Sequence, residues 1–363
     1  MAKRVIDLPP AIEHLVWRKI QDGTYESFDH LVTLALENQL KAEGNNQNWW
    51  LGKHQDTDKS SPVHKPLINK QSSGAAGPGP HSQSVDVASI HRLIEIPTEE
   101  PVLLEAMLPQ DTLSGPLWGQ YYRFFPVKPA LRVLAHLSEE RLPTVPEFRA
   151  AACDVAERVG RRLKLRDVEL GLKLGDLLST SLPESTDKSR RRYADQFLIY
   201  TRPSDRKHDG LLPRLKFISV RSEGQAVRIG LTEAGLNFSR KANPIIDSAT
   251  SGISPLSEEE QEFLLGHLEL EVPDEADHMT NLLGLIARGV IDRESLNKKM
   301  RVYYYSHQDK KRAWTDAHVN TMRAGLQSRL HELGLTSRTK HGLAVSYVLT
   351  EQGRRFLEAR VKG

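Results

Sequence analysis

The chain has 363 residues, enough for two or three domains of ordinary size, and 39% hydrophobic with 27% charged residues is typical of a globular protein. The single cysteine, Cys153, excludes disulfides within the chain, and no apolar run reaches the length of a membrane span or forms a signal-peptide core. We therefore expect a cytoplasmic protein. A net charge of +3, from 50 basic and 47 acidic residues, is too small to indicate that the protein binds nucleic acid. Evidence for such binding must come from local clusters of charge.

Residues 1–41 form a small module with one strand and two helices. A strand-like run over residues 3–8 is followed by a helix that Asp22-Gly23 ends and by a second helix that begins at Ser27. One strand and two short helices cannot enclose a core at this size, so we expect two chains to pair. The apolar residues expected in that dimer interface are Ile6, Leu8, Leu15, Leu31 and Val32.

This module resembles the ribbon-helix-helix family of Arc, MetJ and antitoxin-type repressors over residues 4–40. The resemblance rests on Ile6-Asp7-Leu8-Pro9, on residues 22–27 and on Leu34-Ala35-Leu36-Glu37. It implies that two paired strands lie in the DNA major groove. The outward positions are then Lys3, Val5 and Asp7, and residues 1–40 carry four basic against six acidic side chains. Both DNA contact, with Lys3 the basic contact, and dimerisation alone remain open for this module.

Residues 42–100 are rich in Asn, Gln, Ser, Gly and Pro, and this composition predicts a flexible linker. The chain then becomes globular. In a first domain, residues 101–250, we expect helices over 129–140, 145–163, 167–181 and 187–200, and strands over 214–220 and 225–231. Three helices before a β-hairpin is the winged-helix order. Arg190, Arg191 and Arg192 lie on the helix expected to enter the DNA groove.

A second domain, residues 251–363, repeats this order. Helices are expected over 276–288 and 293–304, then a helix capped by Thr315, then strands over 335–339 and 344–349. The Thr315 helix should turn its apolar stripe inward (Val319, Met322, Leu326, Leu330, Leu333) and present a polar outer face (His318, Asn320, Arg323, Gln327, Arg329). Residues 298–341 hold ten Lys or Arg against three acidic residues, a local charge of +7.

A short motif appears in both domains. Leu231-Thr232-Glu233-Ala234-Gly235 precedes Phe238, and Leu349-Thr350-Glu351-Gln352-Gly353 precedes Phe356, 118 residues later. A strand that ends in this motif and continues into a helix resembles the return of the wing in winged-helix domains. The sequence therefore predicts a mainly α fold with small β elements and two winged helices in tandem.

Winged helices of this kind imply contacts with duplex DNA. Base-reading candidates are Asn320, Arg323 and Gln327, and the expected phosphate contacts are the basic residues of the helices and wings. The phosphate contacts comprise Arg190, Arg191, Arg192, Lys310, Lys311, Arg312, Arg338, Lys340 and His341. A solvated basic face, or winged helices that bind protein, would account for the same pattern.

The aromatic run over residues 117–126 is expected to lie in the core or at a domain interface. If it is exposed instead, Trp118 and Phe124 would bind a protein partner. No nucleotide-binding, metalloprotease or serine-hydrolase motif occurs, and Tyr303-Tyr304-Tyr305 lacks the companions of a tyrosine nucleophile. We expect neither catalysis, cofactor nor metal. The sequence thus favours a dimeric DNA-binding regulator or adaptor, with a non-enzymatic scaffold of a DNA-handling complex, whose partner is an ATPase or nuclease, as the alternative.

Overall fold

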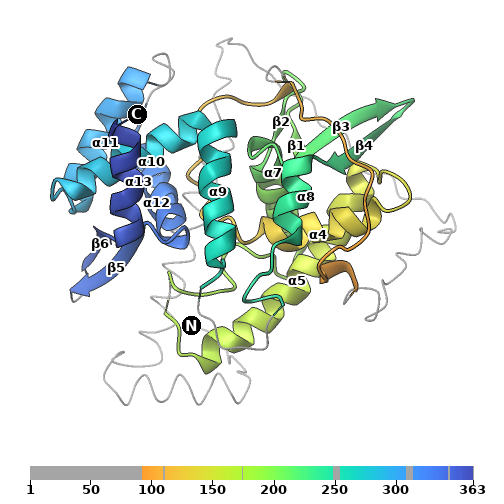
Figure 1. The fold of residues 1–363 in the computed structure, drawn as a ribbon, viewed down its shortest axis with the longest axis horizontal. Helices are drawn as coiled ribbons and strands as arrows, with labels where there is room; N and C mark the ends of the chain where they lie inside the picture. Colours follow the sequence, from red (N-terminus) through yellow and green to blue (C-terminus); the bar gives the residue numbers. More distant parts are fainter. Residues whose placement is uncertain are drawn as a thin grey trace, which may run out of the picture. The chain divides into compact units, whose positions relative to one another are not determined.

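The computed structural model describes residues 92–108, 111–173, 175–247, 254–307, 314–341 and 344–362, without the side chains of residues 307, 340, 341, 344, 361 and 362. These residues belong to a unit that spans residues 82–363 and is separate from residues 1–81. The described part is mainly helical and contains three two-stranded antiparallel sheets (Figure 1). The coarse part of the predicted fold, mainly α with small β elements, is therefore confirmed. None of the described helices combines the length and apolar composition of a membrane span.

The first half, residues 92–247, begins with two long helices, α4 (Val127–Leu137) and α5 (Val145–Glu169). Thr144 and Glu147 form a reciprocal capping box at the start of α5, which satisfies two backbone N–H groups there. The separate helix predicted over residues 167–181 is wrong. Helix α5 instead continues to Glu169, and turns follow in which Gly171 and Gly175 have φ of +60° and +96°.

Short elements complete the first half. Helix α6 (Asp187–Tyr193) continues as the π-helical turn η2 (Ala194–Leu198), and the strands β1 (Tyr200–Thr201) and β2 (His208–Asp209) then pair. Helix α7 (Leu211–Arg214) precedes the hairpin of β3 (Ile218–Glu223) and β4 (Ala226–Leu231), and α8 (Glu233–Arg240) follows. The first predicted strand thus begins four residues late, because residues 211–214 form a helical turn.

The second half, residues 254–362, has four helices before its hairpin. They are α9 (Glu258–Glu271), α10 (Pro273–Ala287), α11 (Arg293–His307) and α12 (Asp316–Glu332). Strands β5 (Thr336–His341) and β6 (Ala344–Leu349) follow, and α13 (Glu351–Lys362) comes last. Thr315 caps α12 as predicted, since its side chain accepts a hydrogen bond from the backbone N–H of His318.

The two hairpins are related by a constant shift of 118 residues. Ile218 pairs with Leu231 in the first, and Thr336 pairs with Leu349 in the second. After each hairpin a threonine begins the next helix: Thr232 accepts from the N–H of Gly235, and Thr350 accepts from that of Gly353.

The glycines of both copies are required by packing. A Cβ at Gly235 would overlap the carbonyl of Phe217, and a Cβ at Gly353 would overlap that of Leu335, again 118 residues apart. The repeated motif therefore folds in the same way in both halves.

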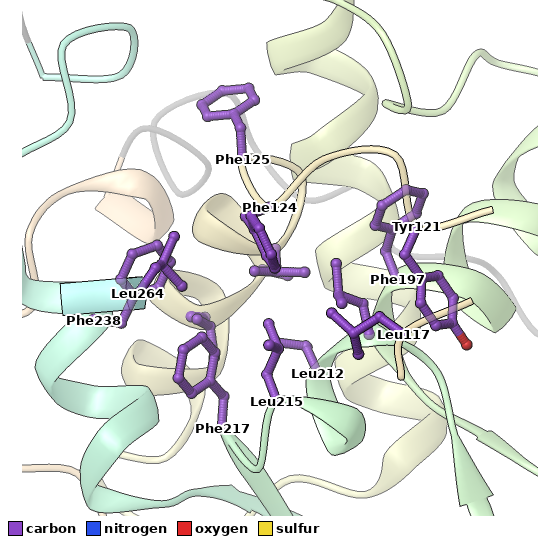
Figure 2. Close-up of a cluster of buried hydrophobic side chains, with 14 of the residues drawn as sticks. Leu117, Tyr121, Phe124, Phe125, Phe197, Leu212, Leu215, Phe217, Phe238 and Leu264 are labelled. Atoms are coloured by element: carbon purple, nitrogen blue, oxygen red, sulfur yellow. The ribbon is translucent and has the colours of Figure 1, made fainter. Parts of the chain in front are cut away.

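One core of buried apolar side chains extends from Leu117 to Leu335 and includes residues of both halves. Figure 2 shows Phe124 inside this cluster, between Leu264 of α9 and the side chains of Leu212 and Leu215. The two predicted domains, 101–250 and 251–363, therefore share a core. A buried ion pair also links them, because Lys128 Nζ of α4 lies 2.8 Å from Glu260 Oε1 of α9, with neither side chain exposed.

Candidate nucleic-acid interface

Helix α12 turns its predicted apolar stripe inward. Val319, Met322, Leu326, Leu330 and Leu333 are each at most 2% exposed. The base-reading residues predicted on this helix were Asn320, Arg323 and Gln327. If only the direction of the apolar stripe mattered, these three side chains would face solvent.

The predicted base-reading role of Arg323 and Gln327 is wrong for this conformation, because the two side chains are 7% and 3% exposed. Arg323 donates from Nε to Asn297 Oδ1 at 2.7 Å, from Nη2 to Asn320 Oδ1 at 2.8 Å, and to Gln327. The Asn320 oxygen also accepts from Arg293 Nε at 2.9 Å. Burial lowers the pKa of Arg323, with a further lowering from Arg293. These polar groups satisfy one another and present no set of donors to a base edge.

A second surface of α12 is covered by residues 117–125, which we term the aromatic segment. Gly119 and Gly325 lie back to back, so that a Cβ on Gly325 would overlap the carbonyl of Gly119, and a Cβ on Gly119 would overlap that of Thr321. The Trp118 ring stacks on His318, with 6.1 Å between ring centroids. The backbone of the aromatic segment therefore occupies the side of α12 that a DNA groove would need.

Arg329, predicted on the outer face of α12, is fully buried beneath the aromatic segment. Its guanidinium pairs with Glu275 of α10, with Nη2 2.7 Å from Oε1, and donates to the carbonyl of Tyr121 at 2.6 Å and that of Trp118 at 3.2 Å. Burial acts to raise the pKa of the Glu275 carboxyl, but Arg329 and His278 together outweigh it, so the pKa is lowered. Arg329 is thus a structural cation that joins the two halves.

Glu332 of α12 and Phe124 of the aromatic segment form a second contact between the two halves. The Glu332 carboxylate accepts hydrogen bonds from the backbone N–H groups of Phe124 and Phe125, and burial raises the pKa of Glu332 to about 7. Phe124 is 0% exposed, so the partner-binding role predicted for it is corrected: its ring packs within the protein's own core. Trp118 is half-buried against α12.

The predicted phosphate contacts of the second half are mostly paired or not described. Arg338 Nη2 lies 3.0 Å from Asp176 Oδ2 of the first half. Lys340 and His341 lie on β5, where their side chains are outside the described part. Other predicted site residues also lie outside the described residues; they are Lys310, Lys311, Arg312, Lys3, Ile6, Leu8, Leu15, Leu31 and Val32.

The first half presents a basic surface on α6. Arg190 faces α5, where it pairs with Asp154 and, at 2.7 Å, with Glu157. Arg191, whose side chain is 82% exposed, approaches Asp195 only to 3.8 Å, and Arg192 is also exposed. Exposed Lys188, one turn earlier, shares their side of the helix. We term Lys188, Arg191 and Arg192 the α6 basic face.

Arg161 of α5 lies beside α6, because Glu157 pairs with both Arg190 of α6 and Arg161. Gly160 allows this approach, since a Cβ there would lie 3.1 Å from Leu182 Cβ just before α6. Residues 158–166 contain five Lys or Arg and no acidic residue. This run escaped our sequence interpretation, although its charge pattern alone marks it.

The tyrosines considered as nucleophiles do not form such a site. Tyr304 is buried, and its hydroxyl bonds to His278 Nε2 at 2.8 Å. Burial raises the pKa of both Tyr303 and Tyr304. Within the described ranges no cluster of His, Cys, Asp and Glu has the arrangement of a metal site.

Comparison with known proteins gave no match among protein-family models, curated proteins or solved structures.

Proposed function

We propose that the protein is a non-enzymatic, dimeric DNA-binding regulator or adaptor that contacts duplex DNA through the α6 basic face. In this proposal the first half is the DNA-contacting winged helix, and the second half is a winged helix that stabilises it. The observation that carries the proposal is the exposure of Lys188, Arg191 and Arg192 on one side of α6. Exposed cations on a helix are suited to phosphate contact, which dominates the affinity of proteins for DNA.

The repeat supports the winged-helix interpretation. Each half has helices before a hairpin, and each hairpin returns through a threonine-capped helix with the same register. In the first half Thr144 forms a β-bridge with Arg228, which adds the third strand position common in winged helices. The exposed part of α12 carries short polar and small side chains instead of cations. We therefore assign the DNA contact to the first half.

The ribbon-helix-helix resemblance supports a dimer formed through residues 1–41. Two copies of a weakly binding face on one assembly bind DNA more tightly than one, because the second contact becomes intramolecular. Replacing Leu31 by Asp should therefore yield monomers in light scattering and a weaker DNA complex. Unchanged mass at micromolar concentration would contradict this part of the proposal.

A salt series with matched charge variants tests the DNA contact. Each phosphate contact contributes about 0.9 to the slope of log K against log salt concentration. The variant Arg191→Gln, Arg192→Gln should therefore lower the slope by roughly 1.8 and weaken binding at every salt concentration. The control variant Lys298→Gln, Lys299→Gln removes two exposed, adjacent cations of α11 and should leave the slope unchanged. Equal losses in both variants would assign the binding to general positive charge instead.

A scaffold function is the second candidate, and a specific observation favours it. Residues 258–277 contain nine Asp or Glu and no Lys or Arg, and seven of the nine lie outside the core, all except Glu260 and Glu275. The acidic surface that these seven form repels DNA, so α9 and the start of α10 are suited to protein contacts. If wild-type protein shows no salt-dependent DNA binding, this second candidate replaces the first.

A further inference from the structure

An open groove lies between residues 103–106, α8 and α9 and has a volume of about 830 Å³. Its apolar lining includes Phe263 and Leu270, and the Leu270 side chain is 81% exposed. Four acidic residues also line it: Glu105, Glu233, Glu262 and Glu271. Lys216 is the one cation in this lining, and its Nζ pairs with Glu271 at 2.9 Å. The groove therefore offers an apolar floor with an acidic rim.

The end of α5 has the complementary composition. Leu165 and Val168 are 69% and 79% exposed, and their spacing of three residues places them on the same side of the helix. Residues 158–169 hold five Lys or Arg against Asp167 and Glu169, so the helix end is net positive. Exposed Arg162 and Lys164 also bond within the chain, Arg162 to the carbonyl of Ile245 and Lys164 to Glu184. Exposed apolar side chains beside such charge are typical of interaction sites.

The groove and the α5 end of one chain do not meet. No residue of α5 lines the groove, and Leu165 and Val168 are largely exposed in their own chain. Much of α5 is packed in the core, so its last turns cannot bend back to the groove.

We propose that the acidic groove of one chain receives the basic apolar end of α5 from a second copy of this chain. Leu165 and Val168 would cover Leu270 and Phe263, and the cations of residues 158–166 would face Glu105, Glu233 and Glu262. Charge complementarity of this kind selects the partner and its orientation. The contact is head-to-tail, so it leaves a free groove and a free α5 end at the two ends of every assembly.

The contact joins one helix end to one groove, whereas stable interfaces bury roughly 1,200–2,000 Å². We therefore expect association that depends on concentration and salt, and that strengthens when chains gather on a dimer or on DNA. This inference concerns contacts between copies and does not depend on DNA binding.

Disulfide trapping in the full-length protein tests the proposal. Cys153 is buried, and burial raises the pKa of its thiol to about 11, so introduced cysteines should react selectively. Chains with Leu165→Cys and chains with Leu270→Cys, carrying tags of different size, are mixed and mildly oxidised. Cross-linking between the two variants is expected to exceed that within either. Val302→Cys, at a 62% exposed position on α11, is the matched control for random collision.

Charge variants test the same contact in equilibrium sedimentation. Glu262→Lys places like charges opposite each other and should weaken self-association at least about tenfold, and Arg162→Glu in the second chain should restore it. Glu358→Lys on α13 is the control, since it makes the same change at another exposed position. Trapping that favours Leu165 with Leu165, or that does not exceed the Val302→Cys control, overturns the proposal. So does self-association that Glu262→Lys leaves unchanged.

Discussion

Because Gly325 lies so close to Gly119, replacing Gly325 by alanine should change stability differently from the same replacement at Gly266. Gly325 in α12 and Gly266 in α9 both lie in helix interiors, where replacement by alanine normally stabilises a protein by about 1 kcal/mol. A Cβ at Gly266 would meet no atom within 4 Å, whereas a Cβ at Gly325 would overlap the backbone of Gly119. Helix propensity alone predicts the same gain at both positions.

The packing predicts opposite signs. To admit a methyl group at Gly325, the aromatic segment must move away from α12, and this movement stretches the bonds from Arg329 to the carbonyls of Trp118 and Tyr121. Hydrogen bonds from charged donors contribute about 1.5–3 kcal/mol each, so losing two outweighs the gain in propensity. We expect Gly325→Ala to lower the free energy of unfolding by about 2–5 kcal/mol.

Urea unfolding followed by circular dichroism measures both variants against wild type. Gly266→Ala should raise the transition midpoint and Gly325→Ala should lower it, with little change in slope. If Gly325→Ala stabilises the protein as Gly266→Ala does, the aromatic segment does not cover α12, and the reasoning about its buried face fails.

Two further substitutions probe the junction between the halves, and a third probes the cap of α13. Arg329→Met should lower the free energy of unfolding by about 3–5 kcal/mol, because Glu275 remains buried without its cation, and adding Glu275→Gln should recover part of that loss in the same urea assay. The pKa of Glu332 is raised to about 7 in the folded state, so between pH 4.5 and 7 the native state holds a proton that the unfolded state has lost. The stability that this proton contributes is fully present below the unfolded pKa near 4.5 and is lost as pH rises towards 7. Glu332→Gln should flatten that decline in thermal unfolding between pH 4.5 and 7; an unchanged profile would assign it elsewhere. Thr350→Ala should cost about 1 kcal/mol through the lost cap of α13, and Thr350→Ser should restore it.

Local chemistry accounts for what the sequence predicted well. Thr315 caps α12 because its side chain accepts a hydrogen bond from the backbone N–H three residues on. The apolar stripe of α12 follows from helical periodicity, and the repeated Leu-Thr-Glu-x-Gly motif places a threonine cap after each hairpin. These features depend on neighbours in the chain, so the sequence contains them directly.

Contacts between distant segments account for what was missed. Periodicity separates the inner from the outer side of α12, but it does not show that residues 117–125 cover part of the outer side. Arg323 and Arg329 therefore appeared to be surface cations, although their partners lie on α10, α11 and the aromatic segment. In the same way the triple arginine was identified from its charge. That Arg190 is partly buried and pairs with Glu157, whereas Arg191 is exposed, follows from the packing of α5 against α6.

The most direct test of the account maps which helix lies against DNA. A DNA-cleaving reagent is attached to a cysteine at Lys188→Cys on the α6 basic face or at Thr321→Cys on the exposed side of α12, and native Cys153 is buried and stays unlabelled. We predict cleavage of bound duplex from position 188 and none above background from position 321. Strong cleavage from position 321 with none from position 188 would contradict the assignment of DNA contact to the first half.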